Sequence, residues 1–289
     1  MKPGKTIVVA VREEATASIA LERAFRMSRS SQDHFSLVHV SRMASWQRVS
    51  ELLTPEWRIP EGQPRPDPYA WLVKLSESAK AAGHHVTHEV LEGEPGKAIV
   101  EHARQIGADL IVVAPPRDGL ARELLLGSTA LRILRTSTCP VLVARGRITS
   151  AYTRPLLAMD LDESGQRVAQ AASAWLDGLQ ADLVHAYRVP EEGLLRMDGY
   201  PEDAITKLLG LVRADAESKM AAYQSALPGS TIHLEHGFAS TVMLEVALRL
   251  KSDIVVLGKH RGSITDERTI GSVAQFMIYN CPTDILLVP

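Results

Sequence analysis

The strongest constraint on the fold of this 289-residue chain is that its second half repeats its first. Residues 86–143 align with residues 230–287 without a gap, and apolar positions match almost throughout. Identities are sparse, but Asp109 aligns with Asp253. A repeat of this length indicates two copies of one structural unit.

We therefore predict two domains, residues 1–145 and residues 154–289, joined by a short polar connector. Each is long enough to bury a core of its own. In each, short apolar runs alternate with helical stretches, which predicts an α/β fold: a five-stranded parallel sheet flanked by helices. In the first domain the strands are expected near residues 6–11, 36–40, 86–91, 110–114 and 141–144. Residues 54–68 carry five prolines and predict a surface loop.

The composition fits a globular protein and excludes several kinds of partner. Hydrophobic residues make up 45% of the chain and charged residues 23%. The net charge of −2 gives no strong attraction to nucleic acid or to an anionic membrane. Cys139 and Cys281 do not form a disulfide framework, and the N-terminus lacks the pattern of a signal peptide. We expect a cytoplasmic protein with no membrane and no nucleic-acid partner.

Ligands of such sheets bind beyond the carboxyl ends of the strands, where the strand order reverses. In the second domain the segments that follow strands one and four are residues 160–164 and 258–263. Gly271-Ser272 then opens the last predicted helix. These three segments predict a binding crevice.

The order and spacing of these features resemble the universal stress proteins. In that family the first strand ends in Val-Asp or a similar pair, as in Met159-Asp160, and the second strand has a Leu-His-Val type of sequence. A Gly-x2-Gly-x9-Gly-Ser/Thr signature follows the fourth strand. The resemblance covers essentially the whole chain, twice.

The resemblance implies two Rossmann-like domains of the adenine nucleotide alpha-hydrolase-like type. It also implies that the two domains form an intrachain pseudo-dimer through their last strands, residues 141–144 and 285–288. Two such chains can pair again as a homodimer.

For the second domain, the resemblance implies a site for ATP or AMP, with Mg²⁺. The Asp160 carboxylate would accept hydrogen bonds from ribose hydroxyls. Gly258 and Gly271 would let backbone amides approach phosphates at a helix N-terminus. Arg261 replaces the middle glycine, and it either adds a bidentate phosphate contact or fills the phosphate site. The expected cofactor-binding residues are Ala158, Met159, Asp160, His185, Ala186, Gly258, Lys259, His260, Arg261, Gly262, Gly271, Ser272 and Val273.

The first domain departs further from the family pattern. Arg12 stands where the aspartate is expected, and arginine offers no acceptor for ribose. Ala114 and Arg117 replace the first two glycines, and only Gly127-Ser128 remains. We therefore expect a degenerate nucleotide site in this domain.

Each of these residues also has a structural explanation. Asp160 can cap the following helix, because aspartate is a favoured N-cap residue. Gly271-Ser272 can simply be residues that are favoured at the beginning of a helix. His39 and His185 lie at the same place on buried strands, so a structural role is favoured over a catalytic one.

The remaining histidines predict no metal site, and the sequence predicts no catalytic residues. His85 and His88 point to opposite faces of a strand, and so do His233 and His236. The motifs of serine hydrolases and zinc proteases are absent.

We therefore expect a stress-response regulatory protein that binds ATP or AMP in its second domain, with at most slow ATP hydrolysis. The alternative is a tandem scaffold that holds no nucleotide, or a protein that binds a small metabolite or lipid.

Overall fold

The fold was analysed in a computed structural model of the whole chain. It describes residues 4–41, 69–114, 126–145, 151–176, 178–260 and 269–289. The chain divides into two compact units, unit 1 (residues 1–144) and unit 2 (residues 145–289), and each is described by itself. The proline-rich segment 54–68 lies outside the described residues.

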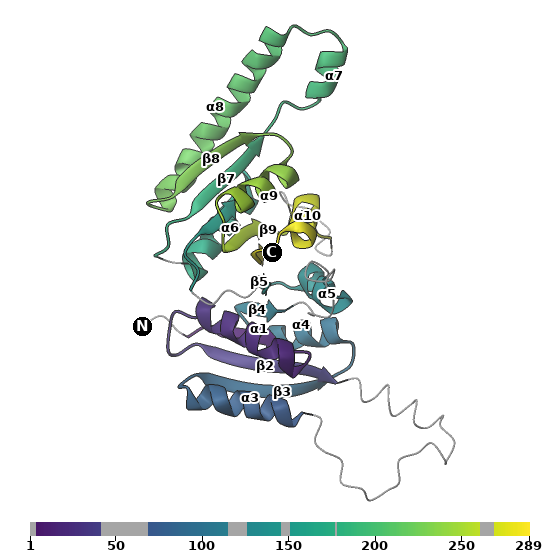
Figure 1. The fold of residues 1–289 in the computed structure, drawn as a ribbon, viewed down its shortest axis with the longest axis vertical. Coiled ribbons are helices and arrows are strands. Elements are labelled where there is room, and N and C mark those ends of the chain that lie inside the picture. The colour runs from purple at the N-terminus through teal and green to yellow at the C-terminus, as the bar shows by residue number, and fades with distance from the viewer. Residues whose placement is uncertain (1–3, 42–68, 115–125, 146–150, 177, 261–268) are drawn as a thin grey trace, which may run out of the picture. The chain divides into compact units, whose positions relative to one another are not determined.

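Unit 1 is a parallel α/β unit (Figure 1). In chain order its elements are β1 (Thr6–Ala10), α1 (Glu14–Met27), β2 (His34–Ser41), α3 (Ala70–Ala81), β3 (His85–Glu92), α4 (Pro95–Gln105), β4 (Leu110–Val113), α5 (Ser128–Thr136) and β5 (Val141–Val143). Its described strands pair in the order β3-β2-β1-β4-β5, and every pair is parallel.

Unit 2 repeats this topology, and its described residues include a short helix, α7, before α8. Its elements are β6 (Pro155–Ala158), α6 (Glu163–Trp175), β7 (Asp182–Tyr187), α7 (Glu192–Met197), α8 (Glu202–Ala226), β8 (Thr231–His236), α9 (Ala239–Arg249), β9 (Ile254–Gly258), α10 (Ser272–Asn280) and β10 (Asp284–Val288). The order is β8-β7-β6-β9-β10, again all parallel. The predicted Rossmann-like architecture with five-stranded sheets is confirmed in the described part of both units.

Helices cover both faces of each sheet. In unit 1, α1 and α3 contact each other, whereas α4 contacts α5. In unit 2, α6 contacts α8, and α9 contacts α10. The central strands are buried on both faces, which explains their continuous apolar sequences.

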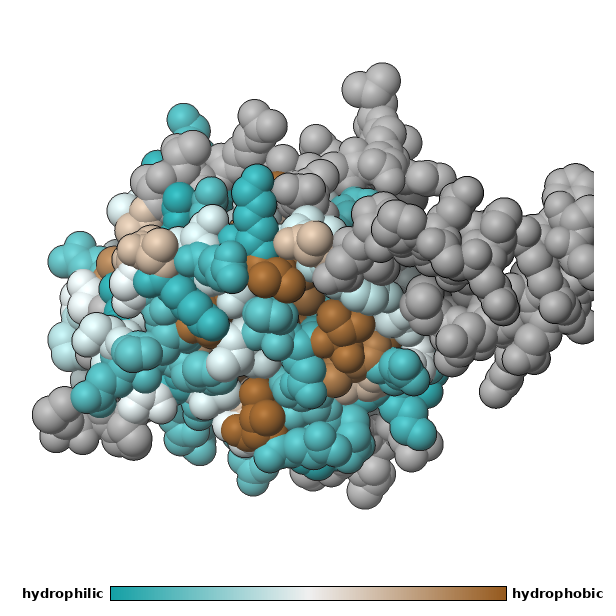
Figure 2. Space-filling model, turned by 90° about the horizontal axis from the view of Figure 1, so that it is seen from below, coloured by the Kyte–Doolittle hydropathy of each residue, from teal (hydrophilic) through white to brown (hydrophobic). Residues whose placement is uncertain are grey.

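The surface of unit 1 is mostly polar at its α3 and β3 end. Seen from that side, the described residues show small separate groups of hydrophobic side chains among hydrophilic ones (Figure 2). Scattered exposed hydrophobic residues of this kind are normal for a soluble surface and indicate no binding site.

The aligned aspartates of the repeat hold equivalent backbone positions. The Asp109 carboxylate accepts the N–H of Thr6 at 2.8 Å, where β1 begins. The Asp253 carboxylate accepts the N–H of Thr153 at 2.7 Å and that of Arg154 at 3.0 Å, directly before β6. Each aspartate precedes the strand next to the central one, so it fixes the register of that pair.

A second aspartate of unit 2 ties the start of the unit to its last strand. Asp284 is fully buried at the start of β10. It accepts the backbone N–H of Arg145 at 2.6 Å and the hydroxyl of Tyr152 at 2.7 Å. Burial lowers the pKa of Arg145, although the thiol of Cys281 and the carboxylate of Asp284 act in the opposite direction. The segment before β6 is thereby anchored in unit 2.

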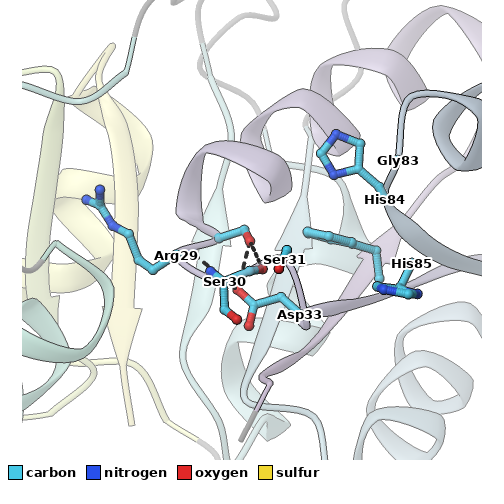
Figure 3. A pocket seen from close by; sticks show the side chains of 9 residues that line it. Arg29, Ser30, Ser31, Asp33, Gly83, His84 and His85 are labelled. Atoms are coloured by element: carbon cyan, nitrogen blue, oxygen red, sulfur yellow. Dashed lines mark hydrogen bonds between the residues drawn. The ribbon is translucent and has the colours of Figure 1, made fainter. Parts of the chain in front are cut away.

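Asp33 closes the turn between α1 and β2 in unit 1 (Figure 3). The side chain is only 3% exposed. One carboxylate oxygen accepts the N–H of Lys5 at 2.8 Å. The other accepts the Ser28 hydroxyl at 2.7 Å and the N–H groups of Arg29 and Ser30 at 3.1 and 3.3 Å. Burial by itself raises the pKa of Asp33, but these hydrogen bonds outweigh it and hold the pKa below its usual value.

We predict that Asp33→Asn destabilises unit 1 in a pH-dependent way. The amide group of asparagine would face N–H and O–H donors, at a cost of about 1–3 kcal/mol near pH 7. Because the folded pKa is lowered, the carboxylate stabilises the fold fully above the unfolded pKa of about 4 and progressively less as pH falls through the folded pKa. Urea unfolding at pH 7, 5 and 3 should show a difference in the free energy of unfolding between wild type and variant that becomes smaller only at the lowest pH.

The matched control is Asp198→Asn, which changes an exposed aspartate at the end of α7. It should unfold like the wild type at each pH. A gap for Asp33→Asn that stays constant down to pH 3 would contradict the role given to the ionised carboxylate.

Candidate functional site

The predicted crevice lies where the strand order of unit 2 reverses. From β6 the chain continues to β7 on one side, and β9 lies on the other side. Leu157 of β6 is in register with Val256 of β9, so the segments after these two strands emerge side by side. This is the position where parallel α/β sheets bind ligands.

The loop after β6 is held by two side chains that the sequence analysis did not single out. Asp162 is the N-cap residue of α6 and accepts the N–H of Ser164 at 2.8 Å. The hydroxyl of Tyr223, on α8, donates to the carbonyl of Asp162 at 3.0 Å and lies 3.4 Å from the carbonyl of Asp160. Burial raises the pKa of Tyr223, and the negative charges of Asp162 and Asp160 raise it further. The capping role considered for Asp160 is therefore filled by Asp162.

Two glycines bring α6 unusually close to the strand ends. A β-carbon at Gly165 would clash with the carbonyl oxygen of Asp160. A β-carbon at Gly258 would clash with the hydroxyl oxygen of Ser164, a residue that is itself buried. Gly258 therefore has a packing role at this place, whether or not a ligand also approaches its backbone.

The segment that leaves β9 is joined to the start of α10 through the backbone of Lys259. The Lys259 N–H donates to the carbonyl of Val288 at 2.6 Å, and its carbonyl accepts the N–H of Gly271 at 2.9 Å. A β-carbon at Gly271 would lie 3.2 Å from that carbonyl, which is a tight contact. Gly271 is the N-cap residue of α10, so the helix presents its first amides from Ser272 onward.

His185 has a clear structural partner. Its Nδ1 lies 2.8 Å from the carbonyl oxygen of Met159, so this nitrogen carries the proton and donates. In unit 1 the Nδ1 of His39 makes the equivalent bond to Val11 at 3.1 Å. The pKa of His39 is lowered by burial, which this hydrogen bond opposes. The repetition of the bond in both units supports a role in the fold.

The predicted site residues divide into three groups. At the carboxyl edge of β6 and β9 and the start of α10 lie Ala158, Met159, Asp160, Gly258, Lys259, His260, Gly271, Ser272 and Val273. The side chains of Met159, Lys259 and His185 are buried, whereas Asp160 and Ser272 are at least partly exposed. The second group, His185 and Ala186, lies on the neighbouring strand β7. Arg261 and Gly262 lie outside the described residues.

The same edge of unit 1 has different chemistry. Arg12, which replaces the aspartate, is exposed, and Ala114 follows β4. Gly127 is the N-cap residue of α5, but a β-carbon there would meet no atom of the described residues within 4 Å. This glycine is therefore not required by close packing, in contrast to Gly271. Arg117 lies outside the described residues.

His233 and His236 of unit 2 and His84 of unit 1 each have a separate partner. His233 lies 2.8 Å from Asp182, and His236 lies 2.9 Å from Glu192. His84 stacks on the ring of Phe25, with 3.7 Å between ring centroids. In the described part of the chain, no group of three or more His, Cys, Asp and Glu side chains is placed to hold a metal ion.

Unit 1 contains a cavity of about 480 Å³ at the other end of its strands. It lies between the turn that precedes β2 and the turn that precedes β3, and its lining includes Asp33, Phe35 and His84 (Figure 3). The Asp33 carboxylate is engaged in closing its own turn, so this cavity does not present it to a ligand. None of the predicted site residues lines it.

Among the described residues, no helix is long and apolar enough to cross a membrane.

Comparisons with known proteins agree with this architecture. A universal stress protein of Methanocaldococcus jannaschii, MJ0531, is 40% identical over 102 residues, which are 35% of this chain and 53% of that protein. Universal stress protein YxiE of Bacillus subtilis is 32% identical over 146 residues, 48% of this chain and 97% of that protein. The crystal structure of PA1789 from Pseudomonas aeruginosa, described as functionally unknown, has a TM-score of 0.69 and 17% identity; the match covers 98% of this chain and 92% of that one.

The structural match supports the fold alone, because its identity is low. The sequence model of the Universal stress protein family, however, matches residues 4–145 and again residues 151–289. The chain therefore belongs to the universal stress protein family and carries two of its domains in tandem.

Proposed function

We propose that unit 2 binds an adenine nucleotide, ATP or AMP with Mg²⁺, and that the protein regulates a stress response through this occupancy rather than by efficient catalysis. One observation carries the proposal. The carboxyl ends of β6 and β9 and the start of α10 bring Asp160, Gly258 and Gly271-Ser272 to one edge of the sheet in a member of this family.

The chain's own residues have distinct tasks in this proposal. Asp160 accepts hydrogen bonds from ribose hydroxyls. The first amides of α10, from Ser272 onward, and the helix dipole attract the phosphates. Tyr223 and Asp162 hold the loop that carries Asp160, so this acceptor is positioned before a ligand arrives. Unit 1 is proposed not to bind nucleotide, because Arg12 and Ala114 replace the aspartate and the first glycine.

A second candidate function is a scaffold that holds no nucleotide, or a protein that binds a small metabolite or lipid. The packing roles of Gly165 and Gly258 favour it, because they explain these glycines without a ligand. A cytoplasmic location belongs to both proposals.

We predict that Asp160→Asn weakens ATP binding at least about tenfold, because hydrogen bonds to a charged group contribute about 1.5–3 kcal/mol. Isothermal titration of the purified chain with ATP and MgCl₂ measures the change. The control is Arg12→Ala at the equivalent position of unit 1, which should leave the affinity unchanged. Equal affinity of wild type and Asp160→Asn would contradict the site.

The number of bound nucleotides distinguishes the two functions. Acid release from freshly purified protein, followed by mass spectrometry, should yield about one adenine nucleotide per chain if unit 2 binds it. If no nucleotide is released and the titration is also flat, the scaffold function is supported.

We predict that Gly258→Ala lowers the melting temperature, because its β-carbon would overlap the Ser164 hydroxyl. Overpacking of this kind costs about 1–3 kcal/mol. Removing the hydroxyl in the double variant Gly258→Ala/Ser164→Ala should restore most of the loss. Gly127→Ala in unit 1, where a β-carbon meets open space, is the matched control.

A double variant that melts as low as Gly258→Ala alone would contradict the packing explanation. The same variant also separates the two roles of the glycine. If it is stable but no longer binds ATP, Gly258 faces the ligand as well as α6.

A further inference from the structure

Helix α8 exposes an apolar face that nothing in unit 2 covers among the described residues. The helix has 25 residues, and Ile205, Ala216 and Met220 face the sheet and are buried. Leu211, on the other side, is 68% exposed, and Leu208, at the border between the two sides, is 39% exposed. Figure 1 shows α8 running along β7 and β8 and continuing beyond them toward α7.

The preceding segment also exposes apolar side chains. Met197, at the end of α7, is 83% exposed, and Leu194 and Tyr200 are more than half exposed. Five large hydrophobic side chains are thus exposed on a single helical hairpin. A concentration of this kind is more typical of an interaction surface than of ordinary solvated surface.

Charged residues accompany Leu211 at regular intervals of four. Asp203 and Lys207 precede it, and Asp215 and Lys219 follow it. Residues four apart lie on the same side of a helix, about 6 Å apart along its axis. Within the helix Lys207 pairs with Asp203 at 3.8 Å, and Lys219 pairs with Asp215 at 2.6 Å. The charges therefore alternate as −, + before Leu211 and −, + after it.

This pattern is complementary to itself when reversed. Consider an antiparallel pair of α8 helices with a two-fold axis at Leu211, crossing so that their rows of residues four apart lie against each other. This pair brings together residues equally far before and after Leu211. Lys207 then faces Asp215 of the second copy, and Asp203 faces Lys219. Each of these contacts occurs twice because of the symmetry, so four opposite-charge contacts form and no like charges meet.

The uncharged positions of the same face also match. Leu208 and Ala214 lie three residues on either side of Leu211, and Ala204 and Ser218 lie seven on either side. The reversal therefore places a leucine opposite an alanine and two small residues opposite each other. Small residues let two helices approach closely, and a leucine opposite an alanine fills the space between them.

We propose that this surface of α8, centred on Leu211 and flanked by Asp203, Lys207, Asp215 and Lys219, pairs with the same surface of a second copy of the chain as an antiparallel homodimer. The proposal does not depend on nucleotide binding.

Two charge-exchanged variants test the pairing while keeping the ion pairs within the helix. Variant A is Asp203→Lys with Lys207→Glu, and variant B is Asp215→Lys with Lys219→Glu. In either variant alone, all four contacts between copies become like-charged. The dissociation constant of the dimer should rise at least about tenfold, measured by analytical ultracentrifugation of the full chain at low ionic strength.

Mixing the variants is the decisive step, because every contact between A and B again joins opposite charges. The mixture should form a dimer at concentrations where A and B alone are monomers. A wild-type protein that remains monomeric at a concentration of about 100 µM, where even a weak dimer would be detected, would overturn the proposal. Variants that dimerise like the wild type, or a mixture that stays monomeric, would overturn it equally.

A cysteine variant tests the position of the two-fold axis. Leu211→Cys should form an intermolecular disulfide under mild oxidation, because the two sulfur atoms would meet at the axis. Arg213→Cys is the control, since this residue is exposed but points to another side of the helix. Equal cross-linking of both variants, or none at position 211, would contradict this axis.

Discussion

The central strand of each sheet is held by hydrogen bonds at both of its ends. One bond comes from an aspartate that precedes one neighbouring strand, and the other comes from a histidine on the other neighbouring strand. The second bond fixes the point from which the following loop departs. In unit 2, Asp253 binds the backbone before β6, and His185 of β7 binds the carbonyl of Met159 after it. The carbonyl is the point from which the loop toward α6 departs. Because the same two bonds occur in unit 1, they are a requirement of the fold and not of a ligand.

The sequence predicted the sheets well, because strands buried on both faces are continuous apolar runs that end within a residue or two of the observed bounds. It also placed His39 and His185 at equivalent positions, but not their partners. Tyr223 was missed, since it reaches the loop from 61 residues away along the chain and no local pattern marks it. Asp162 was missed as the cap of α6 because Asp160 and Asp162 are separated by only one residue and the sequence does not show which of them accepts the N–H of Ser164.

The two units show how one fold supports different chemistry at the same edge. In unit 2, Gly165 and Gly258 let α6 approach the strand ends more closely than a side chain would allow. Unit 1 has Ala17 and Ala114 at these places, so its α1 must be accommodated differently. Close helix packing is thus one physical cause of a glycine directly after the fourth strand, and the proposed nucleotide site would add an accessible backbone as a second. In unit 2 the N-cap residue of α6 is Asp162 and not Asp160, the residue proposed to bind ribose.

The length of α8 is a further difference between the two units. Its counterpart α3 has 12 residues and stays over its strands, whereas α8 has 25 and extends past them. The ion pairs along α8 each contribute about 0.2–0.5 kcal/mol, which is modest local support for the helix. Burying one exposed leucine would contribute about 1.5–3 kcal/mol, which is more than these pairs provide together. Ile205, Ala216 and Met220 are buried against the sheet and hold the helix in unit 2. Burial of Leu211 in the proposed dimer would add more to this stabilisation than the ion pairs do.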